Sequence, residues 1–167
     1  LEIAALERKA ARADMACGVR LNATSDIAWE RVAVEIDGEK FQNVMAAFPE
    51  ITFYDYTKVT KRALAFANGD SRWPENYHLT FSKAEDNDAD VIRVLAAGGN
   101  VAAVFESDLY KAATALGLYT FGGVVSNVID GDETDFRPMD GIGVLVALKA
   151  KGDAKKDTSG FVVRGVA

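Results

Sequence analysis

The sequence predicts an α/β fold with a mainly parallel sheet of about five strands. Five short segments rich in apolar, aromatic and β-branched residues alternate with segments of helical periodicity. The strand-like segments begin near residues 19, 51, 77, 101 and 142, so 24 to 41 residues separate successive starts. Gaps of this length hold a helical crossover between parallel strands, whereas hairpins need only a few residues. Two arrangements remain open, namely a partial barrel and an open three-layer sheet.

The first part of the chain is expected to contribute two helices and two strands. Apolar residues spaced by three and four predict a helix over 1–17, which should end at Gly18 with a left-handed cap. A short strand follows from about residue 19. The alternating residues of 27–40 surround Asp37-Gly38, which indicates an excursion that forms a small hairpin. The next elements are a helix from Phe41 to Phe48, stopped by Pro49, and a strand over 51–57.

The second part of the chain continues the same alternation. A helix is expected over 59–68 and a strand over 77–82. Asp86 or Asn87 can cap a further helix that Gly98-Gly99 closes, and a buried strand follows over 100–106. The last expected elements are a helix from Ser107 to about Leu116, a Gly-rich and acidic stretch over 121–141 without assigned strands, and a strand over 142–150.

Composition excludes several classes of protein. The chain has 167 residues, of which 49% are hydrophobic and 26% charged, and this suits one α/β domain over 1–167 or the C-terminal part of a longer protein. A net charge of −6 argues against a broad nucleic-acid surface, since phosphate backbones require positive charge. No segment has the length of a membrane span. One cysteine, Cys17, and one histidine, His78, exclude an internal disulfide and a His/Cys zinc cluster.

Polar residues follow each predicted strand, and ligands of parallel sheets bind at the carboxyl ends of the strands. The candidate catalytic residues at this edge are Asp26, Asp55 and Lys58, and the candidate ligand-binding residues are Asn22, Ser25, Ser82, Lys83, Lys149 and Lys151. The alternative is that strand ends are polar only because they meet water. Contact with water does not explain Asp55, because this residue lies between two tyrosines inside a strand. We therefore expect a buried, paired carboxylate, with Lys58 or a lysine of the last strand as its partner.

Three further features have competing interpretations. The acidic loop with Asp130, Asp132 and Asp135 could hold a divalent cation, but a solvated turn is the simpler interpretation, and we expect no metal there. The basic turn over 149–156 could hold a phosphate or could simply be solvated. His78 stands at the start of a strand, so it should point away from the carboxyl edge and serve a structural role.

Several strings resemble a known family when they are taken together. They are VRLNATSDIAWE (19–30), FPEITFYDYTK (48–58), NYHLTFSKAEDND (76–88), GGNVAAVFES (98–107), VIDGDETDFRPMD (128–140) and LKAKGDAKKDTSGFV (148–162). They are similar to a phage- and prophage-borne family of unknown function, the gene-product-eighty-eight proteins of mycobacteriophages. The resemblance implies a cytoplasmic protein of the host cell. It also implies a cysteine-rich segment upstream, which could hold an iron–sulfur cluster or another metal only where that segment is present.

Two functions of different classes fit these observations. The first is an enzyme, or part of one, that binds a phosphorylated or nucleotide-like small molecule at the carboxyl edge of the sheet. The second is a non-catalytic phage accessory protein that binds a host protein. Convergence of the polar strand-end residues in one pocket favours the first, and an exposed apolar patch around 27–29 and 119–121 favours the second.

Overall fold

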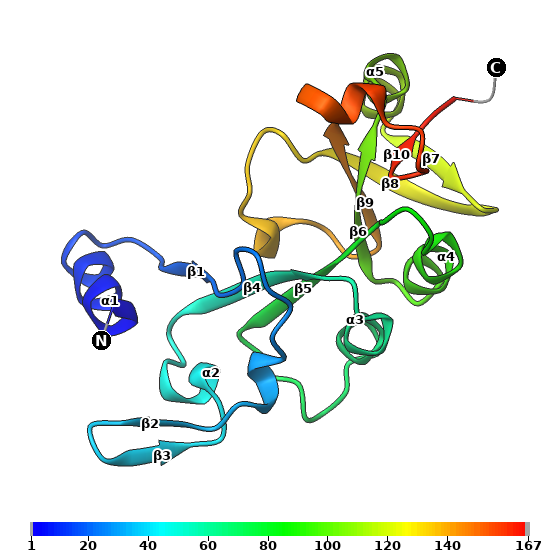
Figure 1. The fold of residues 1–167 in the computed structure, drawn as a ribbon. Coiled ribbons are helices and arrows are strands. Elements are labelled where there is room, and N and C mark those ends of the chain that lie inside the picture. The colour runs from blue at the N-terminus through cyan, green and yellow to red at the C-terminus, as the bar shows by residue number, and fades with distance from the viewer. Residues whose placement is uncertain (1, 166–167) are drawn as a thin grey trace.

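A computed structural model describes residues 2–165, which form a mixed α/β fold around an eight-stranded sheet. Seven strands follow the order β1-β4-β5-β6-β9-β8-β7, and β10 pairs with the end of β6 beyond its contact with β5 (Figure 1). The strands are β1 (Gly18–Arg20), β4 (Thr52–Thr57), β5 (Tyr77–Ser82), β6 (Asn100–Phe105), β9 (Val144–Lys149), β8 (Val124–Asp130), β7 (Leu118–Phe121) and β10 (Val162–Val163). The sheet is open and does not close into a barrel.

The five strands expected from the sequence are β1, β4, β5, β6 and β9, and they are neighbours in chain order. Every pairing among them is parallel, with Asp55 of β4 beside Leu79 of β5 and Ala102 of β6 beside Val146 of β9. The mainly parallel sheet is therefore confirmed. Its strands all end at the same edge, which brings the residues after β1, β4 and β5 close together.

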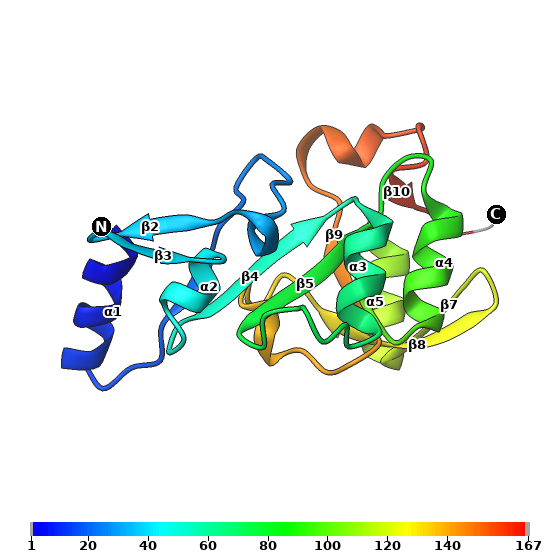
Figure 2. The ribbon, with the colours of Figure 1, turned by 90° about the horizontal axis from the view of Figure 1, so that it is seen from below.

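Helices cover one face of this sheet. They are α2 (Val44–Ala47), α3 (Thr60–Ala67), α4 (Asp88–Ala96) and α5 (Ser107–Leu116), whereas α1 (Glu2–Arg12) lies apart from them at the β1 end of the sheet and has no buried residue (Figure 1). Figures 1 and 2 show α3, α4 and α5 grouped on the same side of the strands. Val91 and Val94 of α4 belong to the same buried cluster as Phe81, Val101 and Leu145 of the strands. This apolar contact holds the layers together, because such side chains contribute about 1.5–3 kcal/mol each when buried.

An irregular segment covers part of the opposite face. Residues 131–143, with the short helix η2 (Arg137–Met139), pass beside β4 and β5 (Figure 1). The ring of Phe136 packs edge-on against Tyr54 with 5.4 Å between ring centroids. Two further short helices, η1 (Trp29–Arg31) and η3 (Gly152–Lys156), follow β1 and β9 respectively. None of the described helices is long and apolar enough to cross a bilayer.

The structure corrects the expected boundaries near the N-terminus. Helix α1 ends at Arg12, and the left-handed residue after it is Asp14 with φ 53°. Gly18 belongs to β1 instead of a helix cap. An added Cβ there would meet the ring of Phe136, so glycine allows this ring to pack closely on the strand. The expected hairpin is confirmed as β2 (Val34–Ile36) and β3 (Glu39–Phe41), and it removes Phe41 from the short helix α2, which Asn43 caps.

One hairpin was not expected from the sequence. The stretch after α5 forms β7 and β8, which pair antiparallel on either side of Gly122-Gly123. Both glycines have positive φ, 54° and 88°, as a two-residue hairpin turn requires. Strand β8 then pairs parallel with β9 and extends the sheet beyond the five expected strands.

Candidate functional site

Asp55 is fully buried in β4 and anchors a network of hydrogen bonds at the carboxyl edge. Its Oδ1 accepts a hydrogen bond from the backbone N–H of Asn22 at 2.6 Å. Its Oδ2 accepts from the Asn22 side-chain amide at 3.0 Å and from the Tyr77 hydroxyl at 2.8 Å. Burial raises the pKa of Asp55, while the hydrogen bonds from Asn22 and Tyr77 oppose that shift. The buried carboxylate is therefore confirmed, but the expected pairing with a lysine is wrong, because the partners are the neutral donors of Asn22 and Tyr77.

The Asn22 side chain, held by Asp55, also forms hydrogen bonds with the loop that follows β1. Its Oδ1 accepts hydrogen bonds from Ser25 Oγ at 2.8 Å and from the Trp29 indole at 3.0 Å. Its Nδ2 also donates to the carbonyl of Ile27 at 3.0 Å. One buried side chain thus fixes both ends of residues 22–29.

Asp26 and Glu30 anchor the same loop to helix α3 through Arg62. The guanidinium is almost fully buried, and it donates to both carboxylate oxygens of Glu30 at 3.1 and 2.9 Å. It also pairs with Asp26 Oδ1. Asp26 in turn accepts from the hydroxyl of Thr57 at 2.9 Å and from the backbone N–H of Lys58 at 2.8 Å. The planar fork of arginine suits this arrangement, since it can serve two carboxylates at once.

The Tyr77 hydroxyl connects the two halves of the network. It accepts a hydrogen bond from Arg62 Nη2 at 3.1 Å and donates to Asp55. Burial raises the pKa of Tyr77, so the phenol stays protonated and can donate. The loop after β1 is therefore tied to β4, β5 and α3 by one continuous chain of polar contacts.

A hollow of about 320 Å³ lies over this network at the carboxyl ends of β1, β4 and β5. It is lined by Arg20, Asn22, Ala23, Thr24, Ser25, Asp26, Tyr56, Thr57, Lys58 and Ser82. Lys58 is exposed and forms no ion pair within residues 2–165. Arg20 lies over the ring of Tyr56, 4.6 Å from its centroid, and pairs with Asp135 at 3.1 Å. Lys58 is therefore the cation of this hollow that remains available to an anionic ligand.

The family follows from comparison with known proteins. A family model described as "Gene product 88" matches residues 1–165. The chain belongs to the gene product 88 family. This is a phage gene-product family of unknown function, so the resemblance found in the sequence strings is confirmed. No curated protein matches the chain, and no solved structure does.

The polar strand-end residues do not all meet in one place. Asn22, Ser25, Asp26, Lys58 and Ser82 line the hollow described above, and Asp55 lies buried below Asn22. The remaining three lysines lie elsewhere. Lys83 is buried, donates to the carbonyls of Ala84 and Gly160 and pairs with Asp88, whereas Lys151 pairs with Asp132 at 3.1 Å. Lys149 lines a separate hollow beside α5.

The carboxylates of the acidic loop are directed to different partners. Asp130 accepts from the Tyr110 hydroxyl, Asp132 pairs with Lys151, and Asp135 contacts Arg20 and the Tyr56 hydroxyl. Within residues 2–165, no three His, Cys, Asp or Glu side chains are grouped so that they could hold a metal ion. Of the residues suggested as an apolar patch for a host protein, Phe121 is buried, Trp29 and Tyr119 are half-buried, and Ile27 is exposed.

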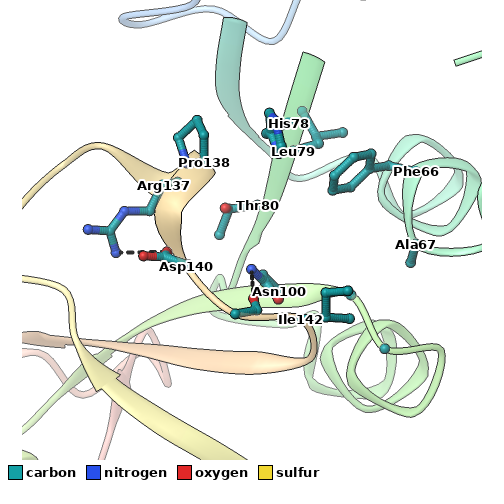
Figure 3. A pocket seen from close by; sticks show the side chains of 13 residues that line it. Phe66, Ala67, His78, Leu79, Thr80, Asn100, Arg137, Pro138, Asp140 and Ile142 are labelled. Atoms are coloured by element: carbon teal, nitrogen blue, oxygen red, sulfur yellow. Dashed lines mark hydrogen bonds and ion pairs between the residues drawn. The ribbon is translucent and has the colours of Figure 1, made fainter. Parts of the chain in front are cut away.

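His78 lies at the opposite end of β5 from the carboxyl edge, as expected. It lines a third hollow of about 370 Å³, together with Phe66, Thr80, Asn100 and Ile142 (Figure 3). Figure 3 shows Arg137 and Asp140 directed toward one another beside this hollow, with 3.4 Å between Nη1 and Oδ2. Both side chains are buried, and the pair joins the first residue of η2 to the residue that caps its C-terminus.

Arg62, Glu30 and Tyr77 are the site residues that sequence reasoning missed. Arg62 carried the clearest signal, because helical spacing places it on the same face as Val59 and Phe66. A charged residue on the inner face of a helix requires a buried partner. That requirement, applied to α3, would have predicted a carboxylate from another element.

Proposed function

We propose that this chain binds a small phosphorylated or nucleotide-like molecule in the hollow formed by β1, β4 and β5. The observation that carries the proposal is the rigid attachment of the loop over 22–29 to a buried polar network. A fixed loop requires little ordering when a ligand binds, and this favours affinity. The position also agrees with the general rule for parallel sheets, whose ligands bind beyond the carboxyl ends of the strands.

The residues of the hollow have distinct roles in this proposal. Lys58 supplies the positive charge for a phosphoryl group, and the hydroxyls of Thr24 and Ser82 can donate hydrogen bonds. Asp26 and Asp55 act as positioning residues, since each of their carboxylate oxygens already accepts a hydrogen bond within the protein.

Calorimetric titration with ADP and AMP tests this proposal. We expect saturable binding of at least one of these probes, and binding that is weaker by about tenfold to a hundredfold in Lys58→Ala, because a hydrogen bond from a charged group contributes about 1.5–3 kcal/mol. Lys40→Ala is the matched control, since Lys40 is an exposed lysine of β3 outside the hollow. Absence of binding by both nucleotides, or equal nucleotide affinities for wild type and Lys58→Ala, would overturn the proposal.

A further inference from the structure

A second hollow at the same edge of the sheet has a different set of cationic side chains. It has a volume of about 430 Å³ and lies between the carboxyl ends of β6 and β9 and the C-terminal segment. Its lining residues are Glu106, Ser107, Asp108, Lys149, Ala150, Lys155 and Arg164. The three cations come from β9, from η3 and from the segment after β10.

The C-terminal wall of this hollow is held in place by several independent contacts. Strand β10 pairs parallel with the end of β6, and the buried Lys83 ammonium donates to the carbonyl of Gly160. Arg164 donates to the carbonyls of Lys155 at 3.1 Å and Asp157 at 2.7 Å. The cations therefore stand on a fixed frame rather than on a free tail.

The acidic side chains of the hollow do not neutralise its lysines. Glu106 pairs with Arg164 at 3.3 Å and accepts from the backbone N–H of Gly165 at 2.7 Å. Asp108 is directed to solvent, with its side chain 96% exposed, and its nearest cation is Lys111 of the same helix. Lys149 and Lys155 form no ion pair within the described chain, residues 2–165. A chain with net charge −6 thus keeps two uncompensated cations beside one concave surface.

We propose that this hollow is a phosphate-binding site, in which Lys149 and Lys155 contact the anion and the Ser107 hydroxyl donates to it. Lysine ammonium groups bind phosphate as point charges, and a hydroxyl completes such a site without adding charge. The lysines of the basic turn over 149–156 therefore do not all belong to this site. Lys149 and Lys155 face the hollow, whereas Lys151 pairs with Asp132 and Lys156 is not among the lining residues.

This site is separate from the hollow of the proposed function. Lys58 follows β4 and Lys149 ends β9, and three strand intervals lie between these strands in the order β4-β5-β6-β9. At about 4.8 Å per interval the strands are separated by roughly 14 Å, and the two hollows share no lining residue. Binding at one hollow can therefore be measured independently of binding at the other.

Amide chemical shifts during a titration with sodium phosphate, at constant ionic strength and against sodium chloride, test the proposal. We expect saturable shifts at residues 106–108 and 150. We expect about fivefold weaker binding for Lys155→Ala and for Lys149→Gln, which keeps most of the aliphatic stem. Lys156→Ala is the matched control, because it removes the neighbouring exposed lysine of η3 that does not line the hollow.

The outcomes separate this site from the first hollow. Unchanged phosphate affinity in Lys58→Ala supports a distinct site, even where ADP and AMP fail to bind near Lys58. The proposal is overturned when chloride produces the same shifts as phosphate, or when Lys155→Ala and Lys149→Gln both bind like Lys156→Ala. Loss of the shifts at 106–108 in Lys58→Ala would also overturn it, since the phosphate would then belong to the other hollow.

Discussion

Replacing Asp55 with alanine tests whether the buried network holds the fold at the carboxyl edge. The substitution removes the acceptor of three hydrogen bonds, two from Asn22 and one from Tyr77. The Asn22 side-chain amide keeps its second bond to the carbonyl of Ile27, whereas the Asn22 backbone N–H and the Tyr77 hydroxyl lose the acceptors described above. Alanine therefore leaves two buried donors without an acceptor.

The expected loss follows from these two donors. Each buried donor left without a partner costs about 1–3 kcal/mol, and release of the carboxylate from burial offsets part of the sum. We expect Asp55→Ala to lower the free energy of unfolding by about 2–4 kcal/mol. For a chain of this length, that corresponds to a decrease in Tm of about 5–15 °C.

Urea unfolding followed by tryptophan fluorescence measures this loss. The reporters are well placed, since the Trp29 indole bonds to Asn22 and Trp73 stacks on Tyr77 with 5.3 Å between ring centroids. Asp153→Ala serves as the control, because Asp153 is an exposed carboxylate of η3. Equal unfolding midpoints for Asp55→Ala and Asp153→Ala would refute the structural role of Asp55.

The pH dependence of stability follows from the same burial. Because burial raises the pKa of Asp55 above its ordinary value of 3.8, the folded state binds this proton more tightly than the unfolded state does. The contribution of Asp55 to stability is therefore greatest in acid, below 3.8, and declines as pH rises through the raised pKa. Asp55→Asn has no titrating group at this position. The free energy of unfolding of the wild type minus that of Asp55→Asn, measured at each pH, should therefore decline as pH rises. A difference that increases with pH would contradict the direction of the shift.

Two further predictions concern Gly18 and His78. Gly18→Ala should lower the free energy of unfolding by about 1–3 kcal/mol, because the new Cβ would clash with the Phe136 ring. Gly141→Ala, where the nearest atom to the new Cβ lies at 3.4 Å, serves as the control in the same denaturation assay. Burial lowers the pKa of His78, so its contribution to stability should be present above about pH 6.5 and be lost as pH falls through the lowered pKa. Thermal unfolding of wild type and His78→Gln between pH 7 and pH 5 measures this, and parallel pH profiles would contradict it.

The sequence predicts the parallel core because its strands and crossovers carry strong local signals. Each of the five core strands is short, apolar and separated from the next by enough residues for a crossover. The β7–β8 hairpin has a weaker signal, since its strands flank two glycines and run directly into acidic residues. Gly122-Gly123 nevertheless has the form of a two-residue turn, and alternation in Val124–Asp130 supports a strand there. The prediction missed this strand because the Gly-rich and acidic composition of residues 121–141 is typical of an irregular loop.

The candidate site was predictable at the level of single positions but not of partners. Asp55 is recognisable as buried because it alternates with tyrosines in a strand. Its partners come from 33 residues before it and 22 residues after it, and no local pattern specifies such contacts. Charge alone favoured a lysine, yet Lys58 follows the end of β4 in an exposed position while Asp55 points into the helical layer.

The ion pairs of Arg62 with Asp26 and Glu30 fix the position of the loop after β1 more than they stabilise the fold. Desolvation of buried ion pairs consumes much of their electrostatic attraction, so an apolar replacement of similar shape is often as stable. Only a planar, permanently charged group satisfies both oxygens of Glu30 and also reaches Asp26, and these two residues lie at the end of the loop over the hollow. An apolar core would bury the same area but would leave that loop free to move. The buried charges therefore fix where Ser25, Asp26 and Lys58 stand, and the position of these residues is what the proposed ligand would require.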